Sequence, residues 1–206
     1  MNRTLAQVLS GVLHPLLLPT YLFAIILYYM PESTLTLPFR VRWVVLAMIF
    51  FTTFIIPGVA AYSMVRFGHL DSVEMEKREQ RGLPLLFTGI CYMATSYLLY
   101  REAAFDAIFY FVMGIIAASV FLTYVISLFW KISAHGMGMG GALGLLLVLN
   151  WLAPEARMVL PIAAALLLTG AVLTARLALH AHTPAQVYAG LGSGLLLAVS
   201  AAYTGL

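Results

Sequence analysis

Long runs of uncharged, mostly apolar residues alternate with short polar connections along this chain. Because a helix needs about 20 apolar residues to cross about 30 Å of hydrocarbon, each long run is a candidate transmembrane span. Seven runs approach or exceed this length, and they cover residues 5–30, 42–66, 83–100, 104–130, 137–153, 157–180 and 185–206. The pattern predicts an all-α polytopic membrane helix bundle of six to seven transmembrane helices, with residues 1–206 as a single integral membrane domain.

The composition favours the same class of protein. Of the 206 residues, 63% are hydrophobic and 9% are charged, whereas a soluble domain carries about 25% charged residues. Cys91 is the only cysteine, so no internal disulfide can form. The first run has no small-residue cleavage site after it, which predicts a retained span and not a signal peptide. The net charge is only +3, so we do not expect a nucleic acid as a partner. We expect the bilayer as a partner, and the oligomeric state stays open.

The connections between the runs differ in polarity. With seven crossings, the N-terminus and residues 68–82, 131–135 and 180–184 share one face of the membrane. Seven of the eleven Lys and Arg residues lie on this face. Four of the five histidines also lie there, namely His69, His135, His180 and His182. An active site at the membrane surface would need such a convergence of polar side chains.

The stretch "ARLALHAHTPAQVYAG", residues 175–190, puts charge at the end of the sixth run. Arg176 lies in the last turns of that predicted span, where a buried Arg needs an anionic partner or a wet cavity. Its planar guanidinium suits phosphate, because it donates hydrogen bonds in pairs. His182 follows just before Pro184, where the helix should break. Taken alone, the stretch is equally consistent with a snorkelling Arg and interfacial histidines.

A second stretch, "WKISAHGMGMGG", opens the fifth run. Ser133 is placed to cap that helix, and the helix N-terminus would attract an anion between Lys131 and His135. The glycines allow close helix packing. A third stretch, "EMEKREQRGLP", has the alternating charges of a solvated face, but Arg81 stands next to the third run. Ordinary interfacial loops would explain either stretch by itself.

Together the three stretches resemble the type 2 phosphatidic acid phosphatase superfamily, membrane enzymes that remove phosphate from lipids. That family carries S-R-x5-H-x3-D as its third motif. This chain has Ala175 and Arg176, then His182 after five intervening residues, and Gln186 in place of Asp. The following "HTPAQVYAGLGSG" resembles the start of the family's last helix, and the third motif is the most specific of the three.

The other two motifs of the family are more divergent here. P-S-G-H reads as residues 132–135, with Ile for Pro and Ala for Gly. In place of K-x6-R-P, Arg81 stands three residues before Pro84 and Lys77 seven before it. Two apolar runs separate these motifs, which preserves their sidedness. The resemblance covers residues 77–195.

The resemblance implies a mechanism without metal or cofactor. His182 would attack phosphorus and form a transient phosphohistidine, and His135 would protonate the leaving lipid oxygen. A phosphoryl transition state spreads charge over its equatorial oxygens, so positioned cations and amides supply most of the stabilisation. The residues expected to hold the phosphoryl oxygens are Arg81, Arg176, Lys77 or Lys131, and Ser133.

Gln186 is the departure with the largest chemical consequence. A Gln carbonyl one helical turn after His182 can accept the imidazole N–H, but it cannot stabilise the imidazolium as a carboxylate would. Either activity is lower than in the family, or another acid such as Asp71 or Glu74 reaches the site. His14, inside the first run, is either a residue buried against a neighbouring helix or part of the wall of the same cavity. A regular helix would point His180 away from the direction of His182.

Three functions stay open at this level. The leading one is a phosphatase acting on a lipid phosphate or polyprenyl diphosphate. The alternatives are a lipid-binding or transport protein that lost catalysis at Gln186, and a lipid phosphotransferase. A magnesium-dependent prenyltransferase is disfavoured, because Asp71 and Glu74 are too few for paired acidic motifs. We expect a multi-pass protein of the cell (inner) membrane. The excess of Lys and Arg on the site face, seven against four, favours the cytoplasmic side, whereas the resemblance implies a site that faces away from the cytoplasm, so the sidedness stays open.

Overall fold

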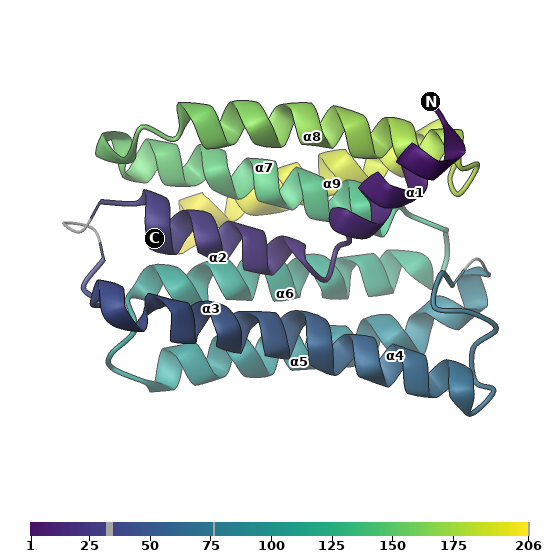
Figure 1. Cartoon of the computed structure of the whole chain (residues 1–206), viewed down its shortest axis with the longest axis horizontal. Coiled ribbons are helices and arrows are strands. Elements are labelled where there is room, and N and C mark those ends of the chain that lie inside the picture. The colour runs from purple at the N-terminus through teal and green to yellow at the C-terminus, as the bar shows by residue number, and fades with distance from the viewer. Residues whose placement is uncertain (32–34, 76, 206) are drawn as a thin grey trace.

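The computed structural model describes residues 1–31, 35–75 and 77–205, and these form helices joined by short connections (Figure 1). No strand occurs in these residues. The helices are α1 (Arg3–Val12), α2 (Leu18–Tyr29), α3 (Arg42–Phe50), α4 (Ile56–Arg66), α5 (Gly82–Arg101), α6 (Ala107–Ser127), α7 (Ala134–Leu152), α8 (Val159–Ala178) and α9 (Pro184–Gly205). Short 3-10 or π segments are η1 (Phe39–Val41), η2 (Phe51–Ile55), η3 (Arg78–Arg81) and η4 (Pro154–Ala156).

Six of the described segments are long and apolar enough to cross a membrane, and α2 is a shorter apolar helix. The α3–η2–α4 segment forms one of the six, and α5, α6, α7, α8 and α9 provide the others. The prediction of an all-α membrane bundle with six to seven spanning helices is therefore confirmed. The chain is a multi-pass membrane protein.

The connections gather at two opposite ends of the bundle. Figure 1 shows the N-terminus and the α4–α5, α6–α7 and α8–α9 connections together at the right-hand end. The α2–α3, α5–α6 and α7–α8 connections lie at the other end. We call the first of these the site end, because it carries the three polar stretches singled out from the sequence.

The first apolar run is not one helix, so the predicted span over residues 5–30 is wrong. It divides into α1 and α2, separated by residues 13–17. Pro15 and Pro19 both lack the N–H that a continuous helix would need. The 12 residues of α2 extend about 18 Å, which is too short to cross the bilayer alone. Helix α1 turns aside at the site end and packs against α8 (Figure 1).

Helix α7 is the centre of the bundle, and α9 packs closely against it. Glycines make this approach possible. A Cβ on Gly136 would lie 2.6 Å from the Val187 carbonyl oxygen, and one on Gly190 would lie 2.6 Å from the Ser133 carbonyl oxygen. Small residues at helical spacing let two backbones meet in this way. The first turns of α7 and α9, which carry His135 of the second motif and Gln186 of the third, are thereby held side by side.

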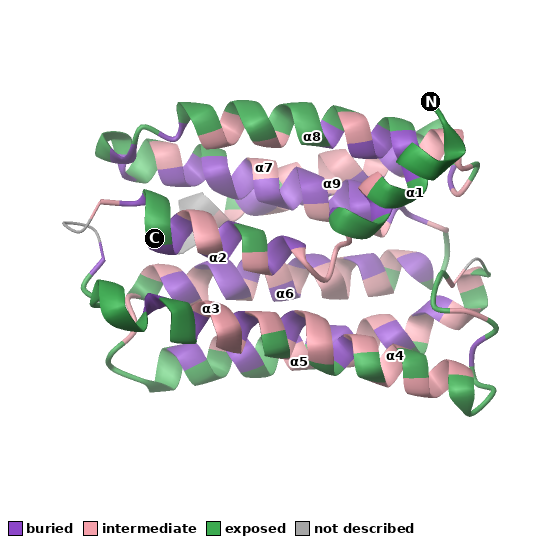
Figure 2. Ribbon diagram, viewed as in Figure 1, coloured by how far each residue is buried: buried purple, intermediate pink, exposed green. Residues whose placement is uncertain are grey.

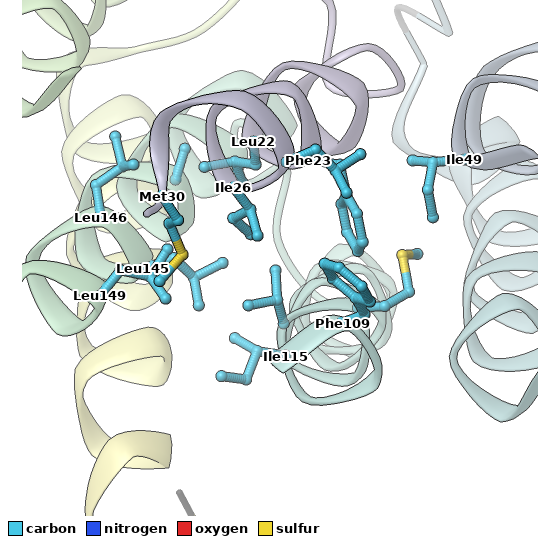
Figure 3. Close-up of a cluster of buried hydrophobic side chains, with 14 of the residues drawn as sticks. Leu22, Phe23, Ile26, Met30, Ile49, Phe109, Ile115, Leu145, Leu146 and Leu149 are labelled. Carbon is cyan, nitrogen blue, oxygen red and sulfur yellow. The ribbon is translucent and has the colours of Figure 1, made fainter. Parts of the chain in front are cut away.

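The apolar core lies between α2, α3, α6 and α7. Figure 3 shows Phe23 of α2 facing Phe109 of α6, with their ring centroids 6.0 Å apart. The outer surface of α8 is largely exposed (Figure 2), with Leu160 and Leu167 more than two-thirds accessible. In a membrane protein such apolar surface faces lipid.

The π segment η2 within the α3–η2–α4 spanning segment has an identifiable cause. Pro57 has no N–H to donate to the carbonyl of Thr53, four residues earlier. The buried Tyr92 hydroxyl donates to that carbonyl over 3.1 Å instead. This contact ties α5 to the irregular turn η2 and sets Tyr92 against the cavity described next.

Candidate active site

One large cavity, of about 960 Å³, extends from the site end into the bundle. Six of the eight residues predicted for the site line it, namely Lys77, Arg81, Lys131, His135, Arg176 and His182. The structure therefore brings residues from all three polar stretches to one place. Ser133 and Gln186 do not line the cavity, but each contacts a residue that does: the Ser133 carbonyl accepts the Met137 N–H, and Gln186 contacts His182.

The cavity changes from polar to apolar with depth. Along α7 it is lined from His135 to Leu145, a distance of about 15 Å and half of the hydrocarbon thickness. Its deeper wall includes Leu22, Tyr92 and Ile115. An amphiphile with its polar group at the site end and its chain towards the bilayer centre matches this gradient.

His182 is held in one tautomer. Its Nδ1 lies 3.0 Å from Gln186 Oε1, which also accepts the Thr183 backbone N–H over 3.2 Å. Because Thr183 must donate, that side-chain atom is an oxygen, and the Nδ1 of His182 therefore carries the hydrogen. The lone pair is left on Nε2. The predicted role of the Gln186 carbonyl agrees with this geometry.

His182 is also neutral at physiological pH. It is buried, with 9% of its surface accessible. Burial lowers the pKa of His182 from 6.5 to about 4, although the Gln186 hydrogen bond acts in the opposite direction, and the nearby Arg81 and Arg176 add to the lowering. Neutral Nε2 is the form that can act as a nucleophile.

The end of α8 determines where His182 lies. His180 adopts a left-handed conformation with φ 52°, His180 N–H donates to Leu177 O, and Ala181 N–H donates to Arg176 O. These two bonds form a Schellman motif, which ends the helix and reverses the chain. The expectation that His180 points away from His182 assumed a regular helix, but α8 ends at Ala178, before His180. His180 is exposed and borders the cavity.

The two arginines of the site are held in different ways. Arg81 is buried, and it donates from Nε to Met75 O and from Nη1 to Ile132 O, both over 3.0 Å. The buried Nε of Arg176 has no hydrogen-bond partner among the residues that the structure describes. The two guanidinium groups are close enough to repel each other, and Glu74 interacts electrostatically with Arg176. An anion between the arginines would relieve this repulsion.

The lysines lie nearer the rim. Lys77 donates to Asp71 over 2.6 Å, and both side chains are exposed. This contact raises the pKa of Lys77 and lowers the pKa of Asp71. Lys131 lines the cavity and acts electrostatically on His182. Asp71 is thus engaged with Lys77, and among the described acids of that loop it is Glu74 that lines the cavity.

Ser133 connects the second and third motifs. Its side-chain oxygen accepts the Gly136 N–H over 3.1 Å, which is the predicted N-cap of α7. Its backbone N–H donates to the backbone carbonyl oxygen of Gln186 over 3.2 Å. Ser133 is fully buried, so its evident role is to fix the α7 start against the α9 start. A contact between its hydroxyl and phosphate stays a prediction.

His135 contacts the broken first run. Its Nε2 lies 3.0 Å from the Ser10 carbonyl oxygen, to which it must donate, and its ring meets that of His14 edge-on at 5.6 Å. Both Ser10 and His14 line the cavity. The sequence indicated His14 only as one alternative and gave no sign of Ser10. Every residue has a backbone carbonyl, so a contact made through that group leaves no recognisable pattern in the sequence.

Within the described residues, no group of three or more His, Cys, Asp or Glu side chains is arranged to hold a metal ion. No protein-family model, curated protein sequence or solved structure matches this chain. The function must therefore be argued from the chemistry of the cavity.

Proposed function

We propose that this protein is a metal-independent membrane phosphatase that removes phosphate from a lipid phosphate or polyprenyl diphosphate. The observation that carries the proposal is the state of His182, a neutral imidazole with Nδ1–H bound to Gln186 and its Nε2 lone pair free. It lies on a cavity shared with two arginines, one with a buried and unpartnered Nε. A nucleophile beside paired cations suits phosphoryl transfer.

The reaction would proceed in two displacements. His182 Nε2 attacks phosphorus, the bond from phosphorus to the leaving oxygen breaks, and that oxygen keeps the electron pair and takes a proton. Water then attacks the phosphohistidine, releases inorganic phosphate and restores the neutral imidazole. Arg81 and Arg176 would hold the equatorial oxygens in both steps, where two-pronged donation follows the geometry of the phosphoryl group.

His135 would deliver the proton to the leaving oxygen. Its Nε2–H is engaged with the Ser10 carbonyl, so Nδ1 is the atom through which a proton can pass. A bound phosphoryl dianion provides the negative charge that stabilises the imidazolium form of His135. The Ser10 carbonyl fixes the ring orientation during this transfer.

The polar end of the cavity lies at the site end of a multi-pass bundle, so the substrate phosphate would be handled at a membrane surface. We propose the cell (inner) membrane as the location. The lipid chain would stay in the apolar depth near Tyr92 and Leu145. Leaving the bilayer would cost a lipid about 0.8 kcal/mol for each CH₂ group exposed to water.

The test is phosphate release by the purified, detergent-solubilised protein with EDTA present. His182→Ala should lower kcat by at least about 10³-fold, because it removes the attacking atom. His69→Ala is the matched control, since His69 is exposed and does not line the cavity. Brief reaction with substrate labelled on the terminal phosphate should give an acid-labile protein label in the wild type and none in His182→Ala.

The outcomes separate the three candidate functions. Full activity in His182→Ala would contradict the proposal. Binding of lipid phosphate without release would favour the carrier protein, for which the neutral Gln186 is the supporting observation. Label transfer to an added alcohol in preference to water would favour the phosphotransferase.

A further inference from the structure

Two buried polar atoms on the cavity wall have no partner. Among the described residues, four buried side-chain nitrogen or oxygen atoms make no hydrogen bond, and two of them, Ser10 Oγ and Arg176 Nε, belong to residues that line the cavity. An unsatisfied buried polar group costs about 1–3 kcal/mol, so such groups need an explanation. Phosphate binding accounts for Arg176, but Ser10 belongs to none of the three motifs.

The other hydroxyl groups on this wall behave differently. Thr88 donates to the Pro84 carbonyl, and Thr123 donates to the Ser119 carbonyl, so both return to their own helices. Ser119 likewise donates to the Ile116 carbonyl. The hydroxyl groups of these side chains are therefore paired with backbone carbonyls. Ser10 is 94% buried and is the hydroxyl on this wall whose oxygen remains unsatisfied in the described residues.

His14 lines the same wall and offers a hydrogen-bond donor of its own, the N–H of its ring. The Leu16 backbone N–H donates to His14 Nδ1 over 3.3 Å, so the neutral ring carries its hydrogen on Nε2. The His14 ring packs edge-on against His135. His135 in turn donates to the Ser10 carbonyl. Ser10, His14 and His135 therefore form one polar cluster at the α1–α2 break, within electrostatic reach of Arg176.

We infer that Ser10 and His14 form a second polar subsite, which binds oxygen atoms of the substrate on the leaving-group side of the scissile phosphoryl group. The inference rests on the proposed function, in which His135 serves the leaving oxygen. Because Ser10 and His14 both contact His135, they lie on that side of the phosphoryl group. The Ser10 hydroxyl and the His14 Nε2–H are donors, so the ligand is an oxygen acceptor.

Two kinds of lipid carry acceptors at this position. A prenyl diphosphate has its second phosphate there, and a phosphatidate has the ester oxygens of its glycerol. A prenyl monophosphate has only the bridging oxygen, which His135 already serves. The subsite therefore predicts discrimination against the prenyl monophosphate.

The experiment compares KM and kcat for farnesyl monophosphate, farnesyl diphosphate and a short-chain phosphatidate. Ser10→Ala should raise KM about tenfold or more for the diphosphate, whose acceptor is charged, and about fivefold for the phosphatidate. It should leave KM for the monophosphate and all three kcat values within about twofold. His14→Leu should act in the same way, while His14→Gln should restore most of the affinity, because its amide can donate from a similar position.

Ser119→Ala is the matched control, since Ser119 lines the same cavity but bonds to its own helix. Each variant must elute as a monodisperse species with a melting temperature no lower than that of the wild type. If Ser10→Ala and His14→Leu match Ser119→Ala on all three lipids, the inference is overturned. An equal loss on all three lipids also overturns it, because the contact would then be with the phosphoryl group or with the catalytic step.

A binding measurement keeps the inference separate from the phosphatase proposal. In the His182→Ala background, farnesyl diphosphate should raise the melting temperature, and Ser10→Ala should reduce that shift. If the wild type releases no phosphate but the shift still depends on Ser10, the phosphatase proposal fails and the subsite stands as a binding site. If the shift is present and insensitive to Ser10, the subsite is refuted whatever the activity.

Discussion

Replacing Gln186 with Glu would add one negative charge beside His182 with little change of shape. Glu and Gln have the same length, so the carboxylate oxygen can keep the 3.0 Å contact with Nδ1 and the contact with the Thr183 N–H. In the wild type, burial and nearby cations lower the pKa of His182 to about 4. A carboxylate within about 4–6 Å raises such a pKa by about 1–3 units.

The sign of the effect on activity follows from the attacking form. Only neutral His182 has a lone pair on Nε2, so activity is lost as the pH falls through its pKa. The acid limb of kcat/KM, which reports the free enzyme, should therefore move from near pH 4 to between about pH 5 and pH 7 in Gln186→Glu. At pH 8 the variant should be faster, because the carboxylate stabilises the positive charge that develops on the ring. A charged hydrogen bond exceeds a neutral one by about 1 kcal/mol or more, which corresponds to roughly five- to tenfold in kcat.

The assay is the pH profile of initial rates on one substrate, so that ionisation of the substrate cancels between variants. Gln186→Asp, the residue of the resembled family, should act in the same direction, and Gln186→Ala should slow the reaction about tenfold. The reasoning would be refuted by an unchanged acid limb in Gln186→Glu. That result would mean either that protonation of His182 does not limit kcat/KM at low pH, or that the side chain of residue 186 does not contact His182.

Two predictions concern the scaffold. A Cβ on Gly140 would lie 3.0 Å from the Leu191 Cα and closer still to its carbonyl oxygen. Gly140→Ala should therefore lower the free energy of unfolding by about 1–3 kcal/mol and lower the melting temperature in detergent. Gly192→Ala is the control, because a Cβ there would meet nothing within 4 Å, and it should be neutral or slightly stabilising. Tyr92→Phe should cost about 1–3 kcal/mol, since it leaves the Thr53 carbonyl unpaired. Equal melting temperatures for the two Gly variants, or an unchanged one for Tyr92→Phe, would contradict these explanations.

Most of the fold could be predicted from the sequence, because a bilayer leaves few options. An apolar run of sufficient length must form a helix to satisfy its own backbone, so six of the seven predicted runs correspond to spanning helices. The first run was mispredicted for a physical reason. Hydropathy measures the average burial of a segment in lipid and does not distinguish one helix from two helices that meet at Pro15.

The site was predictable where it rests on spacing within one element. The four-residue step from His182 to Gln186 is one helical turn, and the structure has the hydrogen bond that this step implies. It was not predictable where it depends on how helices end or on contacts between distant elements. The left-handed conformation of His180 redirects the chain, but the sequence has no Gly at this position to indicate it. The Ser10 contact joins residues 125 positions apart.

The break in the first run also explains why a polar cluster can exist at this depth. Irregular backbone is tolerated in a membrane protein only where its polar groups find partners within the protein or in a wet cavity. At the end of α1, the Tyr21 hydroxyl donates to the Val12 carbonyl over 2.8 Å, and His135 donates to the Ser10 carbonyl. The backbone released by the break is therefore paired by side chains. The Ser10 hydroxyl, in the last turn of α1, has no partner among the described residues and borders the cavity, so the proposed subsite assigns it to a ligand that enters there.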